Sequence, residues 1–380
     1  MVLMALDHTR DFVHITANTD DPMNLATTTV PLFFTRWITH FCAPIFVFLS
    51  GTSIYLQSLR KTSKELGSFL IKRGLWLIAV EFTIVALAWT FNPKFNFVPV
   101  QVIWAIGISM VILGLFVLVR TPFKLMLAIG VVLVGGHNAF DYIEASESFQ
   151  PTFWWDLLHS GFFAFYPVTE SYTLMLVYPF PAWTGVMLLG YCFGVWYTGD
   201  FPPEKRRKQL LYLGLGVLAS FVILRSVNAY GDPVPWTTQK DPIFTFLSFL
   251  STAKYPPSLI YLCMTLGPAI ILLSLMENVQ NKITNWLSVF GKTAFFYYIV
   301  HLFLVHLIGA LFFFARGHTF DYAMALHEQV PFYFVQPGEG YGLGVVYLVW
   351  MGVVIGLYPL CKRYQAYKSS HRDRWWLSYL

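Results

Sequence analysis

Apolar runs long enough to cross a bilayer recur along the whole chain, and they constrain the fold more than any other feature. A membrane-crossing helix needs about 20 mostly apolar residues. The runs cover residues 32–59, 69–90, 98–119, 123–136, 172–197, 210–228, 255–275, 286–314 and 341–360. Together with a helix at the N-terminus, they predict an all-α, polytopic membrane bundle of about ten transmembrane helices.

The low content of charged residues agrees with a lipid environment. Charged residues make up 12% of the 380 residues, and hydrophobic residues make up 56%. A soluble domain usually carries about 25% charged residues, so a soluble surface could not be covered here. Because there is no internal repeat or low-complexity tract, we expect a single transmembrane domain over residues 1–380.

Basic residues alternate between the loops and predict the orientation. Of the 25 Lys and Arg residues, 18 fall in alternate loops around 60–73, 120–124, 205–208 and 282–292 and in the tail from Lys362 onward. The intervening segment 139–170 contains neither Lys nor Arg. Since cytoplasmic loops carry the excess of positive charge, we expect both termini to be cytoplasmic, provided that the first helix is completed upstream.

The first apolar run is short, because Asp7 and His8 follow directly on Leu6. A helix over residues 1–14 would be about 21 Å long, less than the roughly 30 Å hydrocarbon core. We therefore expect a first helix that is truncated, either a partial span or one that begins upstream. A basic leader and a small-residue cleavage site, which mark a signal peptide, are absent.

Ionisable groups within or beside the apolar runs mark the candidate active site. A charge near the bilayer centre costs about 2.5–3.5 kcal/mol on insertion scales, so chains retain one mainly where it lines a cavity or is paired. The candidates are Asp7, His8, Asp11, Arg36, His40, Glu81, Lys254, Tyr255 and His301. They come from different helices but share the outer half of the membrane, which indicates a pocket that opens to the outside.

Helical geometry predicts which ionisable side chains of residues 7–11 lie on the same helix face. His8 and Asp11 are three residues apart and share a helix face, so we expect Asp11 to orient the His8 ring. Asp7 points about 100° away from His8 and is expected to pair with Arg10 or with neighbours of Asp11. The alternative is a polar helix end at the membrane interface without a catalytic role.

Two further positions have structural alternatives. Arg36 and His40 are four residues apart and share a face, and Arg36 would alternatively form a structural pair with Asp7 or Asp11. Glu81 lies midway along a run, where a carboxylate needs a partner or a proton. A salt bridge between Glu81 and Arg36 is the alternative to a role in the site.

The later candidates lie within one further run and at the start of another. His301 and His306 are separated by about 140° of helical rotation, so they do not line one pocket, and we expect His306 to form hydrogen bonds between helices. Lys254 and Tyr255 precede a double proline that sets the start of a helix. Snorkelling to the lipid headgroups is the alternative for Lys254.

Other kinds of chemistry leave no signal in the sequence. Three cysteines fall within apolar runs and Cys361 directly follows one, so none lies in a loop where a disulfide framework would form. His, Cys, Asp and Glu residues show no metal-ligand spacing, so we expect no metal. A Walker loop and a nucleic-acid-binding module are also absent, so we expect no nucleic acid partner.

Several short segments, in this order along nearly the whole chain, carry a family resemblance. They are residues 4–12, 34–37 with His40, 43–53, 73–74 with Glu81, 101–104, 137–138, 178–179, 190–191, 230–233, 254–258 and 291–301. With them the chain resembles bacterial members of the heparan-alpha-glucosaminide N-acetyltransferase catalytic-domain family, within the transmembrane acyltransferases. The wider superfamily has an Arg-Gly pair about three turns before its catalytic histidine, and here that pair would fall before Met1.

The resemblance implies acyl transfer across a membrane. The donor would be cytosolic acetyl-CoA, and the acceptor would be a sugar or another glycan on the far side. His8 matches the first-helix histidine that acts as the base in the superfamily. The partners would be the lipid bilayer, acyl-CoA and a carbohydrate acceptor, and a homodimer is left open.

This chemistry assigns roles to the other candidates. Asp11 or Asp7 would fix the tautomer of the base, and Arg36, His40 or Lys254 would stabilise the oxyanion. The phosphates of CoA need cations, for which Lys72 and Arg73 are the candidates. A proton-coupled transporter or permease and an inactive membrane relative are the alternative functions, although transporters often show internal repeats.

Overall fold

The computed structural model describes residues 1–326, 330–371 and 373–378, so position 372 of the basic tail lies outside the described residues. The chain forms two compact units, and each draws on separate stretches of the sequence. Unit 1 comprises Met1–Cys42, Thr83–Val98 and Val279–Leu380, and unit 2 comprises Ala43–Phe82 and Pro99–Asn278. The single functional domain over residues 1–380 stays a prediction.

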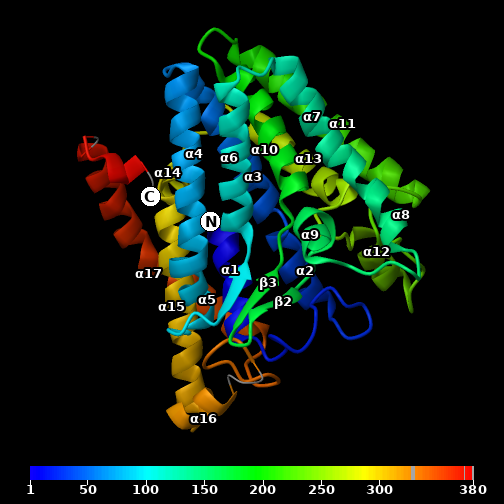
Figure 1. Cartoon of the computed structure of the whole chain (residues 1–380), viewed down its shortest axis with the longest axis vertical. Coiled ribbons are helices and arrows are strands. Elements are labelled where there is room, and N and C mark those ends of the chain that lie inside the picture. Colours follow the sequence, from blue (N-terminus) through cyan, green and yellow to red (C-terminus); the bar gives the residue numbers. More distant parts are fainter. Residues whose placement is uncertain (327–329, 372, 379–380) are drawn as a thin grey trace. The chain divides into compact units, whose positions relative to one another are not determined.

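Unit 1 is built around the first helix. Its helices are α1 (Val2–Val13), α2 (Val30–Thr39), α5 (Ala86–Thr90), α14 (Lys282–Lys292), α15 (Ala294–Ala315), α16 (Phe320–Leu326), α17 (Leu343–Ser370) and the 3-10 turn η5 (Trp375–Ser378). Helix α1 packs against α2, α15 and α17 (Figure 1). The backbone of Tyr341 continues this contact, because its N–H donates to the Val13 carbonyl at 2.8 Å and its carbonyl accepts from Ile15 at 3.1 Å. The N-terminal segment is therefore enclosed by elements from the C-terminal third of the chain.

Unit 2 contains the remaining helices and a small sheet. Its longer helices are α3 (Cys42–Ser58), α4 (Ser63–Val80), α6 (Val102–Leu118), α7 (Phe123–Gly136), α10 (Phe180–Phe193), α11 (Pro203–Val227), α12 (Pro242–Leu250) and α13 (Leu259–Met276). The shorter elements are η1 (Glu81–Val85), η2 (His137–Phe140), α8 (Asp141–Glu144), α9 (Phe153–Trp155), η3 (Asp156–Ser160) and η4 (Gly194–Tyr197). Strands β1 (Phe97–Val100), β2 (Ala164–Thr169) and β3 (Tyr172–Leu176) pair in the order β1-β3-β2. Strands β2 and β3 are antiparallel, with Ala164 opposite Leu176.

The predicted fold class is confirmed, because the chain is an all-α, membrane-type bundle. Among the described residues, six helices are long and apolar enough to cross a membrane: Val30–Ser58, Phe123–Glu144, Pro203–Val227, Leu259–Met276, Ala294–Ala315 and Leu343–Ser370. On α17, Leu348 and Ile355 lie two turns apart and are 65% and 67% exposed, as expected of a lipid-facing stripe. The number of about ten helices stays a prediction.

Several apolar runs, among them 172–197 and 286–314, differ from the continuous helices expected of them. Residues Tyr172–Leu176 form β3, and the following helix α10 begins only after Pro179, with a second proline in its first turn. The run over 286–314 is divided at Thr293, between α14 and α15. Hydropathy does not distinguish a buried strand or a helix break from a helix, since all of them are apolar.

Small residues let α4 and α6 lie side by side (Figure 1). Gly67 and Gly74 of α4 face Gly114 and Gly107 of α6 at heptad spacing. A Cβ atom built on Gly74 would lie 2.4 Å from the backbone oxygen of Gly107. A backbone atom cannot move aside cheaply, so close packing here depends on the absence of side chains, as is common between membrane helices.

We expect Gly74→Val to destabilise the protein by about 1–3 kcal/mol, because the added side chain forces the two backbones apart. Thermal unfolding of the full-length protein in detergent measures the effect. Gly216→Val is the matched control, since Gly216 is also helical but has no atom within 4 Å of its built Cβ. Equal destabilisation by the two variants would contradict the packing role of Gly74.

Candidate active site

A pair of buried histidines lies at the centre of unit 1. His8 of α1 and His301 of α15 are 8% and 0% exposed. The Nδ1 atom of His8 lies 2.8 Å from the Nε2 atom of His301, and the two ring planes differ by only 3°. Both residues were predicted for the site, and the structure brings them into direct contact.

The second nitrogen of His301 settles the direction of this hydrogen bond. Its Nδ1 atom lies 2.7 Å from the carbonyl oxygen of Tyr297, which can only accept, so Nδ1 carries the hydrogen. In a neutral ring, Nε2 of His301 is then the acceptor, and Nδ1 of His8 donates to it. The lone pair of His8 is therefore placed on Nε2, the nitrogen required of a general base.

Aromatic side chains surround the two imidazoles. Trp89 meets the His8 ring edge-on at a centroid distance of 4.9 Å, and Tyr298 meets it at 6.1 Å. Tyr297 stacks on His301 at 4.9 Å. These rings exclude water and lower the local dielectric, which strengthens polar interactions at the pair.

A charge-balanced cluster adjoins the pair on α1. The carboxylate of Asp7 accepts from Nη1 of Arg36, which lies 2.6 Å from each oxygen, and from Nη2 of Arg10 at 3.1 Å. Thr39 donates to the same carboxylate at 3.0 Å. Arg10 also pairs with Asp11 at 2.5 Å. Two carboxylates and two guanidinium groups therefore neutralise one another. Charges that are partly buried require such pairing.

The predicted pairings in this segment have different outcomes. The pairing of Asp7 with Arg10 is confirmed, and so is the structural pairing of Arg36 with Asp7. The role of Asp11 in orienting the His8 ring stays a prediction. His40 is buried at the C-terminal end of α2 and keeps its predicted role as a proposal.

Some contacts of the site were missing from the sequence prediction. Thr39 precedes His40 and supplies the hydroxyl that reaches Asp7. Trp89 lies near the end of an apolar run, where no ionisable neighbour draws attention to it. The link between His8 and His301 joins residues 293 positions apart, and local spacing carries no signal of such a pair.

His306 takes the structural role that was expected of it. Its Nδ1 lies 2.9 Å from the Ala88 carbonyl oxygen, and its Nε2 lies 2.8 Å from that of Tyr333. Phe12 and Phe91 stack on its two faces at 4.3 and 3.8 Å. The prediction that His306 forms hydrogen bonds between helices is confirmed.

Glu81 lies in unit 2, at the start of the π-helical segment η1. Its side chain is fully buried, and Oε1 accepts from the backbone N–H of Gln101 at 2.7 Å. Gln101 is the N-cap residue of α6, so the carboxylate lies where the helix dipole favours negative charge. Both the site role of Glu81 and the alternative salt bridge to Arg36 stay predictions.

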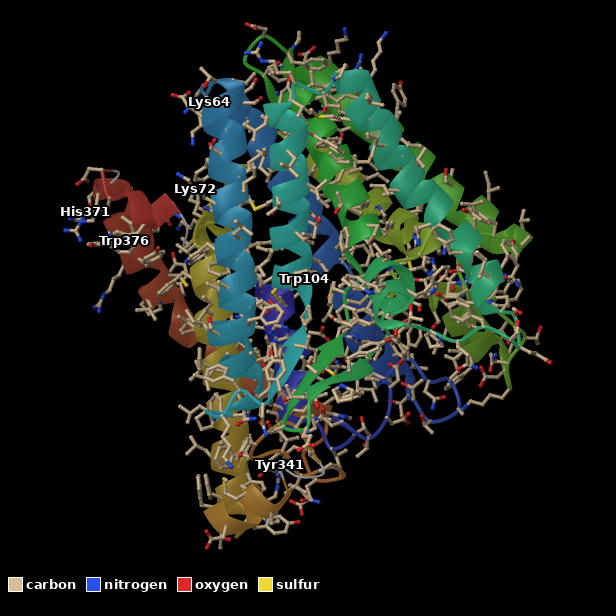
Figure 2. The ribbon with its side chains drawn as sticks, in the orientation of Figure 1. Lys64, Lys72, Trp104, Tyr341, His371 and Trp376 are labelled. Atoms are coloured by element: carbon tan, nitrogen blue, oxygen red, sulfur yellow. The ribbon has the colours of Figure 1, made fainter. Side chains whose placement is uncertain are left out.

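The other predicted residues are also in unit 2. Lys254 is 9% exposed, and its Nζ lies 5.0 Å from the centre of the Tyr255 ring, which itself packs against Phe162, Phe163 and Tyr178. Lys72 and Arg73 are on α4, where Figure 2 shows Lys64 and Lys72 projecting from the helix. Their roles in oxyanion stabilisation and CoA binding stay predictions.

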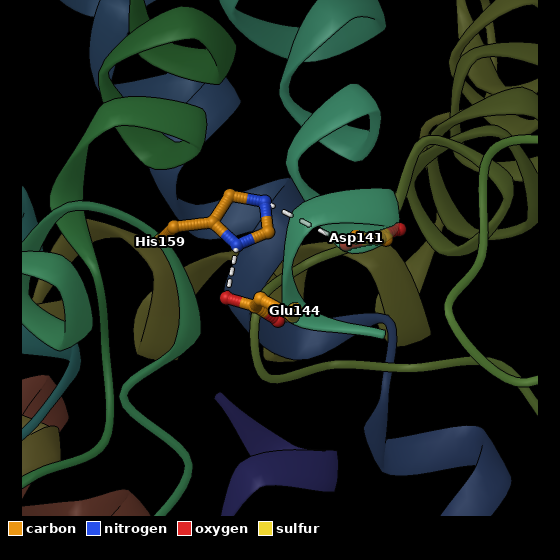
Figure 3. Close-up of side chains that lie close together, drawn as sticks. All are labelled: Asp141, Glu144 and His159. Atoms are coloured by element: carbon orange, nitrogen blue, oxygen red, sulfur yellow. Dashed lines mark hydrogen bonds and ion pairs between the residues drawn. The ribbon is translucent and has the colours of Figure 1, made fainter. Parts of the chain in front are cut away.

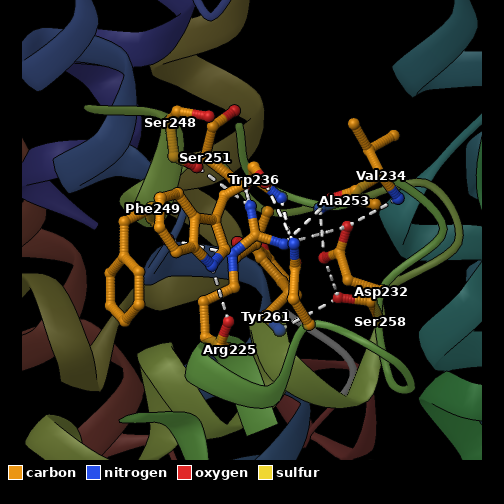
Figure 4. A network of polar contacts seen from close by, with 12 residues as sticks. Arg225, Asp232, Val234, Trp236, Ser248, Phe249, Ser251, Ala253, Ser258 and Tyr261 are labelled. Carbon is orange, nitrogen blue, oxygen red and sulfur yellow. Dashed lines mark hydrogen bonds and ion pairs between the residues drawn. The ribbon is translucent and has the colours of Figure 1, made fainter. Parts of the chain in front are cut away.

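Arg225, at the C-terminal end of α11, organises the loop that follows it (Figure 4). Its guanidinium donates to the carbonyl oxygens of Val234, Ser248, Phe249 and Ser251. Nη1 also lies 3.7 Å from the carboxylate of Asp232. Burial raises the pKa of the Asp232 carboxyl, and the Arg225 charge acts in the opposite direction. This network has a structural role, since the arginine is only 1% exposed.

A third group of ionisable side chains was missed from the sequence. Asp141 and Glu144 of α8 converge with His159 of η3 (Figure 3), and their ligand atoms lie within 4.8 Å of one another. His137, Asp141 and Glu144 recur at helical spacing, which was the available signal. The expectation that no such cluster has metal-ligand geometry is therefore corrected for these residues.

Comparison with known proteins identifies one family. A family model described as heparan-alpha-glucosaminide N-acetyltransferase, catalytic, matches residues 2–223, which is more than half of the chain. The matched region includes His8, Glu81 and the charge-balanced cluster of Asp7, Arg10, Asp11 and Arg36. Comparison with curated proteins and with solved structures finds no match.

Proposed function

The chain belongs to the heparan-alpha-glucosaminide N-acetyltransferase catalytic family, and from this premise we propose that His8 is its general base. The family makes the protein a membrane acetyltransferase. We further propose that the acetyl group comes from cytosolic acetyl-CoA and passes to an amine or hydroxyl of a glycan on the far side of the membrane. The proposal rests above all on the hydrogen-bond chain from His8 through His301 to the Tyr297 carbonyl.

The proposed reaction uses the tautomer of His8 that these hydrogen bonds favour. Nε2 of His8 accepts the proton of the acceptor as its nitrogen or oxygen attacks the thioester carbonyl. The carbon–sulfur bond then breaks, and the proton passes from His8 to the departing thiolate of CoA. Imidazole suits both steps because its pKa near 6.5 lets it gain and lose a proton at neutral pH.

His301 replaces the carboxylate that orients the base in many hydrolases. It accepts the Nδ1 hydrogen of His8 and holds the ring in place, as the third member of a catalytic triad does. The charge-balanced cluster of Asp7, Asp11, Arg10 and Arg36 links α1 to α2 beside the base. Arg36, His40 or Lys254 is the proposed oxyanion ligand, and Lys72 and Arg73 are the proposed phosphate ligands.

Acetyl-CoA binding and turnover by the full-length protein in detergent test this function. We expect acetyl-CoA to raise the unfolding temperature and amino sugars to promote the release of free CoA thiol. A proton-coupled transporter would show neither result. Unchanged stability together with no thiol release, across a panel of amino sugars and glycans, would refute acetyl transfer from CoA.

A further inference from the structure

We infer that His137, Asp141, Glu144 and His159 form a site for a divalent transition metal such as Zn²⁺. The four residues come from the continuous segment η2–α8 and from η3, all within unit 2. Imidazole nitrogens and carboxylate oxygens are the ligands that Zn²⁺ takes in proteins, usually four in a structural site. This site is separate from the histidine pair of unit 1 and goes beyond the proposed transfer reaction.

The contacts of His159 supply the first argument. Its Nε2 lies 2.8 Å from the carbonyl oxygen of His137, and its Nδ1 lies 2.9 Å from Oε1 of Glu144. Both partners are acceptors, but a neutral imidazole has only one N–H to donate. With that hydrogen on Nε2, either a second ring proton or a metal ion must lie between Nδ1 and the carboxylate. A metal ion bound to Nδ1 and to Glu144 meets this requirement.

His137 supplies an independent argument. It is 7% exposed, and among the described residues neither of its ring nitrogens has a hydrogen-bond partner, although the backbone of Pro257 lies close to the ring. Its ring centre lies 5.5 Å from that of His159. Two imidazoles on one tetrahedral zinc, with bonds of about 2.0–2.1 Å, have ring centres roughly 5 Å apart. A small side-chain rotation would therefore bring His137 into the ligand set.

The carboxylates of Asp141 and Glu144 also have contacts that suit metal binding. Oδ1 of Asp141 is buried, lies 3.6 Å from Nε2 of His159 and makes no hydrogen bond within the described part of the chain. Its other oxygen accepts from Asn138 at 2.7 Å, and Glu144 accepts from Nε1 of Trp155 at 2.6 Å. Outer contacts of this kind, including the carbonyl that holds Nε2 of His159, are typical of ligands that surround a bound metal.

The position of the site indicates a structural role. A bound ion would tie the end of the α7 helix to the η3 segment, in the stretch 139–170 that is predicted to face away from the cytoplasm. Once Asp141 turns from the Nε2 edge of His159 toward the ion and His137 rotates to it, four side chains would bind the metal and leave no coordination position open for a substrate. Calcium and magnesium prefer shells of oxygen alone and fit these two histidines poorly.

Metal binding by the full-length protein in detergent tests the inference, after EDTA treatment and removal of the chelator. We expect one Zn²⁺ per chain by elemental analysis and titration calorimetry, a higher unfolding temperature with Zn²⁺, and no such rise with Mg²⁺. Glu144→Gln and His137→Gln are each expected to weaken Zn²⁺ binding at least tenfold. Glu147→Gln and His318→Gln are the matched controls outside the cluster and are expected to bind as the wild type does.

Absorption spectroscopy of the wild type with Co²⁺ makes the test independent of how the variants fold. Tetrahedral Co²⁺ bands that Zn²⁺ displaces would support the site. Zn²⁺ binding of equal strength in the cluster variants and the wild type would show adventitious ions only and overturn the inference. Absence of Zn²⁺ binding by the stripped wild type would also overturn it, and a protonated His159 would then be the cation between the carboxylates.

Discussion

Replacement of His8 by alanine is expected to lower acetyl transfer by about 100- to 10,000-fold, the usual contribution of a general base. The loss should fall on kcat, because the base acts in the transition state and the thioester is held elsewhere. Transfer from acetyl-CoA to an amino sugar, measured with membranes that contain equal amounts of each variant, gives the comparison. Turnover of His8→Ala at the wild-type rate would remove His8 from the mechanism.

Variants of His301 show whether it positions the base. His301→Ala removes the acceptor of the His8 Nδ1 hydrogen, so we expect kcat to fall while KM changes little. His301→Gln retains an acceptor oxygen, and we expect it to restore part of the lost rate. His318→Gln, outside the histidine pair, should turn over as the wild type does. Equal rates for His301→Ala and His301→Gln, at equal unfolding temperatures, would contradict the positioning role.

Replacement of Arg225 by methionine is expected to destabilise the protein by about 3–5 kcal/mol, the effect of removing one partner of a buried charge pair. Methionine has a similar length but no hydrogen-bond donor. The carbonyl oxygens of Val234, Ser248, Phe249 and Ser251 would lose their shared donor. Asp232 would remain buried without its cation, although Ser258 and the Ala253 N–H would still bond to it.

Thermal unfolding in detergent, followed by tryptophan fluorescence, measures this loss. Arg207→Met is the matched control, because Arg207 is on the same helix but its side chain is exposed. We expect that variant to unfold close to the wild-type temperature. An unchanged unfolding temperature for Arg225→Met would show that the network does not hold the loop after α11.

Ion pairs between residues near in sequence could be predicted, and those between distant residues could not be predicted uniquely. Asp7 and Arg10 are three residues apart on α1, and helical periodicity predicts their ion pair. Arg36 lies 29 positions from Asp7, and the sequence offered their pairing only as one alternative among several. The Asp141, Glu144 and His159 cluster was overlooked because His159 joins it only through the fold of the connecting loop.

The amino-acid sequence by itself determined the membrane class, the family and the candidate histidine of the first helix. Transfer to lipid is a sum of local contributions, so apolar runs identify the membrane-embedded part of a chain even where they do not fix its secondary structure. The tertiary structure alone decided that the His8 ring contacts His301, that β3 and Thr293 interrupt two apolar runs, and that Arg225 binds the carbonyls of its own loop. These features depend on which helices pack together, and packing joins groups whose separation along the chain carries no periodic signal.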